Sequence, residues 1–190
     1  MYYGALEAGG TKMVCAIGDA DKNIIDRISI PTGTPDQSVP AMIDYFKKYD
    51  ISALGIGTFG PADINPNSPT YGSIMRSPKK AWEGFSLYKA FTDALGCLVV
   101  VDTDVNAAAW GEYLYGALKG LNSGMYLTVG TGIGGGIISD GRLIHGMEHP
   151  ETGHILIPRR TGDDIPCTCR FHQSLSLIHI SEPTRRVVIS

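Results

Sequence analysis

The sequence predicts an α/β fold, and three features lead to this prediction. Apolar runs of strand length end in glycine loops or in carboxylates, as at 51–61 and 97–104. Between such runs lie segments whose apolar residues have helical spacing. Two glycine-rich turns, at 7–12 and 130–136, each join two expected strands. Strands and helices that alternate in this way are typical of an α/β domain.

The first half of the chain is expected to begin with a hairpin and to continue with a helix and a strand. Residues 2–19 indicate two short strands around a Gly-Gly turn. Residues 38–49 carry apolar side chains at helical spacing, and 51–61 form an apolar run that leads into a glycine loop. The stretch 62–82 is rich in Pro, Asn and Ser, which predicts a long irregular excursion. Loops of that length in compact domains are usually functional or disordered.

The second half continues the alternation. Residues 86–95 predict a helix, with Ser86 as the candidate N-cap. The run 97–104 is typical of a central strand that delivers carboxylates at its C-terminal end. A helix is expected over 106–118, and 124–145 predicts strand, glycine loop, strand, Asp-Gly turn and strand.

Composition limits the class of protein. The 190 residues allow one large domain or two small ones, and the formal net charge of −3 gives no electrostatic support for nucleic-acid binding. No apolar run approaches the roughly 20 residues of a membrane span, and the first residues lack the pattern of a secretory signal. Four cysteines do not make a disulfide framework in a chain of this size, so we expect a reduced, cytoplasmic setting and no membrane partner.

The two glycine turns are the first chemical signal. Successive backbone N–H groups in such turns can point into one concavity and bind phosphate oxygens. Thr11 and Thr131 can add hydroxyl donors, and Lys12 adds a positive charge. The alternative is a pair of ordinary hairpin turns. A dinucleotide site is excluded at 130–136, because the glycines are followed by a strand pattern where that site requires a helix.

Carboxylates gather at the expected junction of a strand and a helix. Asp102, Asp104 and Asn106 follow the apolar run of the strand, and a helix N-terminus adds positive potential there. Asp104 can accept a proton from a sugar hydroxyl that attacks a phosphoryl group. The alternative is that Asp104 or Asn106 caps the helix. The two roles are compatible if different residues fill them.

Two further groups resemble ligand sites. Glu151 and His154 stand three residues apart, which fits a binding pair or a surface glutamate beside a structural histidine. Cys167, Cys169 and His172 lie within six positions near the end of the chain. This cluster could be a finished zinc site, a chance grouping, or a site that lacks its last ligand.

Taken together, these motifs resemble those of the ROK family of sugar kinases, and within it the bacterial fructokinases. The resemblance covers residues 1–172, and the motifs occur in the family's order. The text "FGPADINPNSPTYG" and the later "PKKAW" favour the fructokinase branch over the glucokinases. The motifs that carry the resemblance are "EAGGTK", "GIGTFGPADINPNSPTYG", "DTDVNAAAWGE", "LTVGTGIGGGI", "HPETGH" and "CRFH".

The resemblance implies an α/β, actin/hexokinase-like (ribonuclease-H-like) fold and a reaction. An N-terminal domain would span 1–118, and 119–172 would begin the second domain. The implied reaction is transfer of the ATP γ-phosphate to a hexose with Mg²⁺, most favourably to fructose. Alternatives are a glucokinase or N-acetylhexosamine kinase of the family, or a non-catalytic sugar-binding relative. The family's repressors carry a DNA-binding segment ahead of the first glycine turn, for which we expect no room here.

The resemblance also implies roles for individual residues. Asp104 matches the general base, and Asn106, Glu151 and His154 match the sugar-binding segments. Glu7 is implied as the carboxylate that faces Mg²⁺, and Thr103 stands where the family often has an Asn that contacts the sugar. The residues that match the two phosphate loops are Gly9, Gly10, Thr11 and Lys12 in the first, and Thr131, Gly132 and Gly134 in the second.

The family's structural zinc is only partly matched. His154, Cys169 and His172 match three ligands, whereas the place of the last is held by Leu175, which cannot bind a metal. Cys167 is a candidate substitute. The segment 173–190 contains no family motif, so we expect it to be a non-native tail on a truncated chain.

The kinase interpretation makes one geometric demand. Gly9–Gly10 and Gly132–Gly134 should converge on the phosphates of one nucleotide, and Asp104 should face them across a sugar-sized gap. The full-length parent would bind sugar and ATP in the cytoplasm, as a homodimer.

Overall fold

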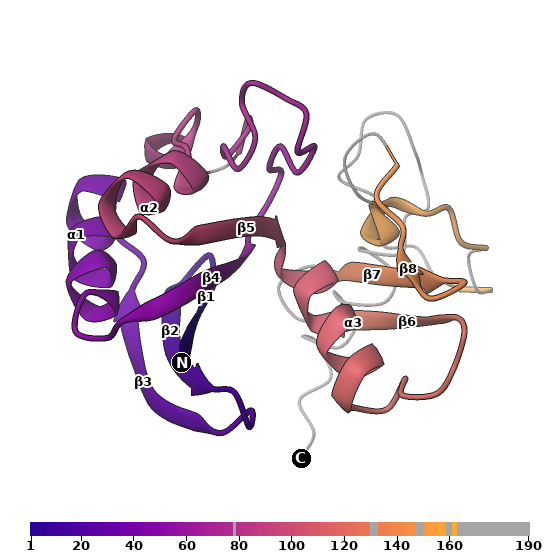
Figure 1. Ribbon diagram of the computed structural model, residues 1–190. Helices are drawn as coiled ribbons and strands as arrows, with labels where there is room; N and C mark the ends of the chain where they lie inside the picture. The colour runs from indigo at the N-terminus through magenta and orange to yellow at the C-terminus, as the bar shows by residue number, and fades with distance from the viewer. Residues whose placement is uncertain (78, 130–132, 147–149, 159–160, 163–190) are drawn as a thin grey trace, which may run out of the picture. The chain divides into compact units, whose positions relative to one another are not determined.

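The computed structural model describes residues 1–77, 79–129, 133–146, 150–158 and 161–162 (Figure 1). The chain divides into two compact units, Met1–Ala107 and Ala108–Ser190. The division falls within helix α3 (Asp104–Tyr115), ahead of the boundary at residue 118 that the sequence suggests.

The first unit is built on a five-stranded mixed sheet with the order β3-β2-β1-β4-β5. β1 pairs with β2, and β2 with β3, in antiparallel fashion, whereas β1, β4 and β5 run parallel. The two strands and the Gly-Gly turn expected over 2–19 are confirmed. The strands are β1 (Tyr2–Ala8), β2 (Lys12–Asp19), β3 (Ile24–Pro31), β4 (Ile51–Thr58) and β5 (Leu98–Thr103).

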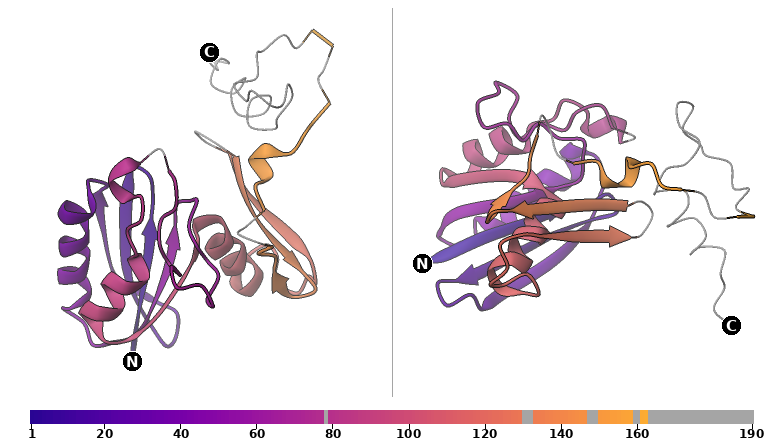
Figure 2. Two further views of the ribbon diagram at one scale, coloured as in Figure 1. Left: turned by 90° about the horizontal axis from the view of Figure 1, so that it is seen from above. Right: turned by 90° about the vertical axis from the view of Figure 1, so that its right-hand side faces the viewer.

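Two helices, α1 (Pro35–Phe46) and α2 (Leu87–Leu95), contact each other and lie on the same face of this sheet (Figures 1 and 2). The core lies between the helices and the sheet. Alternate residues of each strand point into it, as the two-residue period of a strand requires. The central members of this core are Leu6, Ala8, Met42, Phe46, Leu54, Ile56, Phe91, Val99 and Val101.

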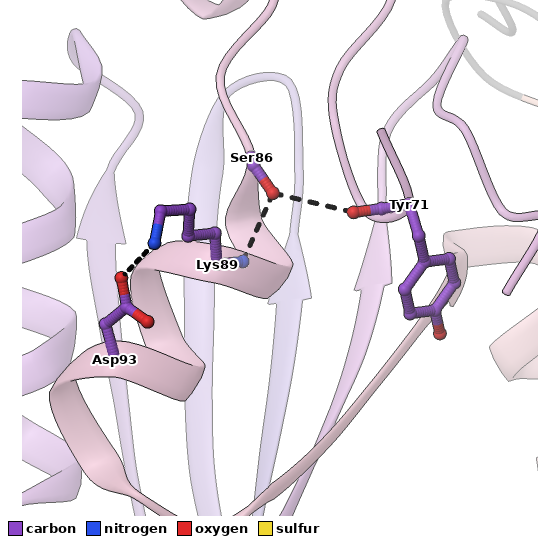
Figure 3. A network of polar contacts seen from close by, with 4 residues as sticks. All are labelled: Tyr71, Ser86, Lys89 and Asp93. Atoms are coloured by element: carbon purple, nitrogen blue, oxygen red, sulfur yellow. Dashed lines mark hydrogen bonds and ion pairs between the residues drawn. The ribbon is translucent and has the colours of Figure 1, made fainter. Parts of the chain in front are cut away.

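Local capping explains where both helices begin. Pro35 occupies the first turn of α1, and the Gln37 side chain accepts a hydrogen bond from the Thr34 N–H at 3.1 Å. Ser86 caps α2 as expected, because its Oγ accepts from the Lys89 N–H at 3.1 Å (Figure 3). Gly96, with φ of 63°, ends the same helix in the left-handed conformation that glycine tolerates.

Two features of the sheet differ from the sequence prediction. Strand β5 was expected to be central, but it is the edge strand of the sheet. Leu98 and Val100, which point away from the core, are 67% and 53% exposed. The apolar run of β5 is therefore buried on one face of the sheet only. Strand β3 was not predicted. It is the opposite edge strand, and its alternating pattern is only half-buried.

The excursion between β4 and α2 is irregular, as predicted, but well tied to the core. Isolated bridges pair Ala62 with Ile74 and Ser73 with Ser86. Asp63 accepts hydrogen bonds from the hydroxyls of Ser68 and Thr70, and these bonds lower the pKa of its carboxyl. The excursion ends in a short 3₁₀ helix, η1 (Lys80–Trp82).

The second unit contains the antiparallel strands β6 (Gly124–Val129), β7 (Ile133–Ser139) and β8 (Arg142–Leu143). The predicted Asp-Gly turn is confirmed, with φ of 49° at Asp140 and 72° at Gly141. A 3₁₀ helix, η2 (Thr152–His154), contacts β7. Among the helices that the structure describes, none is both long and apolar enough to cross a membrane.

Candidate active site

The parallel strands of the first unit place polar groups at their C-terminal ends. Glu7, Gly57 and Asp102 are register partners across β1, β4 and β5, at the C-terminal ends of all three. Register partners point to the same face, so the two carboxylates rise from one face about 10 Å apart, twice the usual strand spacing. Gly57 lies between them and is buried, because the first turn of α3 packs against it.

The junction of β5 and α3 is held by three hydrogen bonds. Asp102 Oδ1 accepts from the Thr103 N–H and from Asn106 Nδ2, both at 2.7 Å. Thr103 Oγ1 accepts from the Asn106 N–H at 3.2 Å, which is the geometry of an N-cap. The cap is therefore provided by Thr103 and not by Asp104 or Asn106. Thr103 is 1% exposed, so its hydroxyl stabilises the helix from inside the core.

Asp104 is the first residue of α3 and is half-buried. Its Oδ1 accepts from the Val105 N–H at 2.9 Å. A carboxylate at this position interacts favourably with the positive end of the helix dipole. The predicted strand-to-helix presentation of Asp104 is confirmed, whereas its role as a base stays a prediction.

Gly57 lets the first turn of α3 approach the sheet. A Cβ at Gly57 would lie 2.9 Å from the Cβ of Ala107 and 3.3 Å from the Cα of Asp104. Real Cβ atoms do not come that close without a shift of their neighbours. The position of Asp104 relative to β4 therefore depends on the absence of a side chain at residue 57.

Asn106 lies beneath this surface. It is fully buried, its Nδ2 is bonded to Asp102, and its Oδ1 has no hydrogen-bond partner among the residues described. The contact of Asn106 with substrate, which the sequence suggested, stays a prediction. Its observed contact orients the Asp102 carboxylate.

The first glycine turn is closed by backbone hydrogen bonds. The Gly9 N–H donates to the Lys12 carbonyl at 3.0 Å, and a Cβ at Gly9 would lie 2.6 Å from that oxygen. Thr32 holds the turn from outside, because its Oγ1 donates to the Gly9 carbonyl at 2.8 Å and its N–H to the Thr11 carbonyl at 3.1 Å. Within the described ranges, the N–H groups of Gly10 and Thr11 donate to no protein acceptor. They are available for an anion.

The second glycine turn is described only from residue 133 onward. Thr131 and Gly132 lie outside the described residues, and Gly134 belongs to β7, where it pairs with Thr128. The expected convergence of the two turns on one nucleotide therefore stays a prediction.

Glu151 and His154 meet beside η2. Nδ1 of His154 lies 3.4 Å from Oε2 of Glu151, and the two side chains are 57% and 50% exposed. Gly153 packs so tightly on β7 that a Cβ would lie 2.4 Å from the Ile133 carbonyl oxygen. The pair is thus held next to the strand that follows the second glycine turn.

Metal ligation is not shown. The described part of the chain contains no group of three or more His, Cys, Asp or Glu side chains that could hold a metal ion. Cys167, Cys169 and His172 fall outside the described residues, as does Leu175. The zinc site stays a prediction that is one ligand short.

Sequence reasoning missed Thr32, Gly57 and the pairing of Asp102 with Asn106. No spacing rule indicated the contact of Asp102 with Asn106, because Asp102 lies in strand β5 whereas Asn106 lies in helix α3. Thr32 and Gly57 contact residues that are distant in sequence: Thr32 bonds the first glycine turn, and Gly57 lies against α3. Only the sheet register shows their place.

Solved structures show the class of fold. The chain matches a ROK family glucokinase from Streptomyces griseus, solved in complex with glucose and AMPPNP, with TM-score 0.67 and 29% identity over 83% of this chain and 51% of that one. It matches the ROK hexokinase from Thermus thermophilus with TM-score 0.73 and 28% identity, over 92% of this chain and 58% of that one. The predicted actin/hexokinase-like α/β fold is confirmed.

The chain belongs to the ROK family, whose model matches residues 3–181. A fructokinase from Lactococcus lactis subsp. cremoris is 46% identical over 84% of this chain, and one from Pediococcus pentosaceus is 42% identical over 90%. A glucokinase from Streptomyces coelicolor is 34% identical over 86%.

These three alignments cover 54%, 60% and 51% of the respective relatives. The chain therefore spans between about half and three fifths of their length. The family match extends past residue 172, and a non-native tail over 173–190 stays a prediction.

Proposed function

We propose that this chain is part of an ATP-dependent hexose kinase whose preferred acceptor is D-fructose, with fructose 6-phosphate as the product. One observation carries the proposal. Asp104 begins a helix at the C-terminal ends of the parallel strands, where β1 carries Glu7 and leads into the first glycine turn. A base, a carboxylate for a cation, and N–H donors for phosphate are what phosphoryl transfer requires.

Asp104 is the proposed general base. It accepts the proton of the attacking sugar hydroxyl while the oxygen of that hydroxyl bonds to the γ-phosphorus and the bond from that phosphorus to ADP breaks. The hydrogen bonds at the β5–α3 junction support this role because they fix the first turn of the helix that carries Asp104.

The first glycine turn is the proposed site of the ATP phosphates. The N–H groups of Gly10 and Thr11 and the charge of Lys12 suit phosphate oxygens, and the tight closure at Gly9 keeps the turn preorganised. Thr131, Gly132 and Gly134 are proposed to form the second phosphate loop. Coverage of both loops by protein would exclude water from the reaction.

Glu7 suits a magnesium ion. It is an exposed carboxylate beside the glycine turn, and Mg²⁺ prefers carboxylate and phosphate oxygens. When bound, the ion would offset the negative charge of the phosphates. The residues present thus fit this cofactor.

Glu151 and His154 are the proposed contacts to sugar hydroxyls. Their half-exposed side chains, 3.4 Å apart, can present an acceptor and an imidazole to a polar ligand. His154 is also the proposed first ligand of a structural zinc with Cys169 and His172. Since a closed zinc site needs four ligands, Cys167 is the proposed fourth.

The choice of acceptor rests on the branch of the family. The two fructokinases are 42% and 46% identical to this chain, whereas the glucokinase is 34% identical. This difference favours fructose over glucose as the acceptor. Glucose is the second candidate, because the S. griseus structure was solved in complex with glucose. The proposal places the parent protein in the cytoplasm as a homodimer.

The test is turnover by the full-length protein that contains this chain. Purified protein is assayed with ATP, Mg²⁺ and a panel of fructose, glucose, mannose and N-acetylglucosamine, and ADP release is measured. We expect kcat/KM to be highest with fructose. Preference for another sugar would correct the acceptor, and no turnover with any hexose would refute the kinase proposal.

A further inference from the structure

Lys79 is part of the "PKKAW" motif, but the sequence assigned it no role, and it lies against the first glycine turn. A Cβ built at Gly10 would lie 3.5 Å from Cε of Lys79, a residue 69 positions further along the chain. Lys79 is half-buried and belongs to the end of the excursion between β4 and α2. Its ammonium group is one bond beyond Cε, so it lies within reach of a ligand at Gly10.

The backbone of Lys79 is fixed by the core. Its carbonyl accepts from the Trp82 N–H at 2.9 Å, and its N–H donates to Oγ of the buried Ser77 at 3.2 Å. Trp82 is 1% exposed and packs edge-on against Phe59 and Phe85, with ring centroids 5.9 and 5.5 Å away. Lys79 is thus presented from a rigid support, which limits the entropy lost when its side chain binds a ligand.

The same support also holds the glycine turn. The Trp82 Nε1–H donates to the Gly33 carbonyl at 2.8 Å, and the preceding residue, Thr32, bonds the carbonyls of both Gly9 and Thr11. Hydrogen bonds therefore run from the turn through Thr32, Gly33 and Trp82 to Lys79. The side chain of Lys79 in turn lies against Gly10, so the turn and the Lys79 segment contact each other at both ends of this chain of hydrogen bonds.

The charge at this point has no acidic partner within the described residues. No ion pair of Lys79 with a described carboxylate is present, whereas its neighbour Lys80 pairs with Glu83 at 3.1 Å. Lys12 adds a second cation to the turn, and the N–H groups of Gly10 and Thr11 are available beside it. The Lys79 side chain against Gly10, the cationic residue Lys12 at the end of the turn, and two N–H donors favour an anion.

We propose that Lys79 is a phosphate-binding residue, whose ammonium group contacts the terminal phosphates of a nucleoside triphosphate held at the Gly9–Lys12 turn. This inference rests on the proposed kinase function and adds a charged contact supplied by the η1 segment. Trp82 and Thr32 are positioning residues, because they act on the phosphate only through Lys79 and the turn.

The first test compares neighbouring lysines in the full-length protein. Lys79→Met removes the charge and keeps the apolar stem, Lys79→Arg restores a charge, and Lys80→Met is the matched control. We expect Lys79→Met to lower kcat/KM for ATP about 10- to 100-fold, the range of a charge-assisted hydrogen bond. KM for fructose should be unchanged, Lys79→Arg should recover part of the loss, and Lys80→Met should equal the wild type.

The second test does not depend on turnover. Binding of inorganic tripolyphosphate to the same four proteins is measured by titration calorimetry, with circular dichroism to confirm folding. We expect Lys79→Met to weaken binding by a similar factor and Lys80→Met to leave it unchanged. If Lys79→Met and Lys80→Met behave alike in both tests, the inference is overturned while the kinase proposal stands. If the protein phosphorylates no hexose but its affinity for tripolyphosphate still depends on Lys79, the kinase proposal is refuted and the phosphate site is retained.

Discussion

The side-chain amide of Asn106 donates a hydrogen bond of 2.7 Å to Oδ1 of Asp102, across the junction of β5 and α3. The donor is fully buried, and the same carboxylate oxygen also accepts from the Thr103 N–H. One contact therefore joins the end of an edge strand to the first turn of the helix that presents Asp104. The remaining oxygen of Asn106 is buried without a partner in the described structure.

Replacement of Asn106 by Ala should destabilise the protein. The change removes a buried donor of a charged acceptor and leaves a small void, so the free energy of unfolding should fall by about 1–3 kcal/mol. Urea unfolding measures this value. Asn67→Ala is the control, because Asn67 is exposed and such changes alter stability by less than about 0.5 kcal/mol. Equal stability of the two variants would contradict the role assigned to Asn106.

Gly57 and Gly55 offer a matched pair on one strand. Gly57→Ala would force a Cβ to within 2.9 Å of Ala107, whereas a Cβ at Gly55 would meet nothing within 4 Å. We expect Gly57→Ala to displace the first turn of α3 and to reduce kcat roughly 100-fold, since small misplacements of a catalytic group are costly. Gly55→Ala should keep wild-type turnover. Steady-state kinetics on both variants in the full-length protein decides the matter, and similar kcat values would show that residue 57 does not set the position of Asp104.

The first glycine turn provides a second contrast. A Cβ at Gly9 would lie 2.6 Å from the Lys12 backbone oxygen, but one at Gly10 would make an ordinary 3.5 Å contact with a flexible side chain. Gly9→Ala should open the turn and weaken tripolyphosphate binding at least about 10-fold, because preorganised N–H donors are lost. Gly10→Ala should leave the fold intact, as measured by the melting temperature. If Gly9→Ala binds the probe as the wild type does, the turn is not the phosphate site.

Asp104→Asn tests the proposed base directly. The amide is nearly isosteric but cannot take up a proton, so kcat should fall about 100- to 10,000-fold, the usual contribution of a general base. The free energy of unfolding should change little, because Thr103 and not Asp104 provides the cap. Rapid turnover by this variant in the full-length protein would mean that another group accepts the proton.

The hydrogen bond from Tyr49 to Asp26 makes stability depend on pH. The Tyr49 hydroxyl lies 2.6 Å from Asp26 Oδ2, and this bond is the main cause that lowers the pKa of Asp26. A carboxyl with a depressed folded-state pKa contributes stability above its unfolded pKa of about 3.9 and loses it as the pH falls through the folded value.

Tyr49→Phe should therefore be less stable than the wild type at neutral pH, and the difference should shrink in acid. Unfolding by urea at pH 7 and near pH 3 checks this expectation. A difference that stays constant over that range would show that the effect comes from packing of the ring and not from the carboxylate.

Local signals in the sequence were sufficient for most elements and for the family. Turn glycines, alternating apolar residues and the cap at Ser86 act over a few neighbours, so the predicted helices and hairpins could be read directly. The ordered motifs identified the ROK family, which the family match confirms. These features need no knowledge of distant contacts.

Tertiary structure decided which of these elements meet. An apolar run looks the same at the centre and at the edge of a sheet, so only strand pairing showed that β5 is an edge strand. The role of Gly57 depends on a helix that starts 47 residues later, and Lys79 reaches Gly10 only because Trp82 is buried beside Gly33. Sheet register and core packing join residues far apart in the chain, and composition or local spacing carries no information about such contacts.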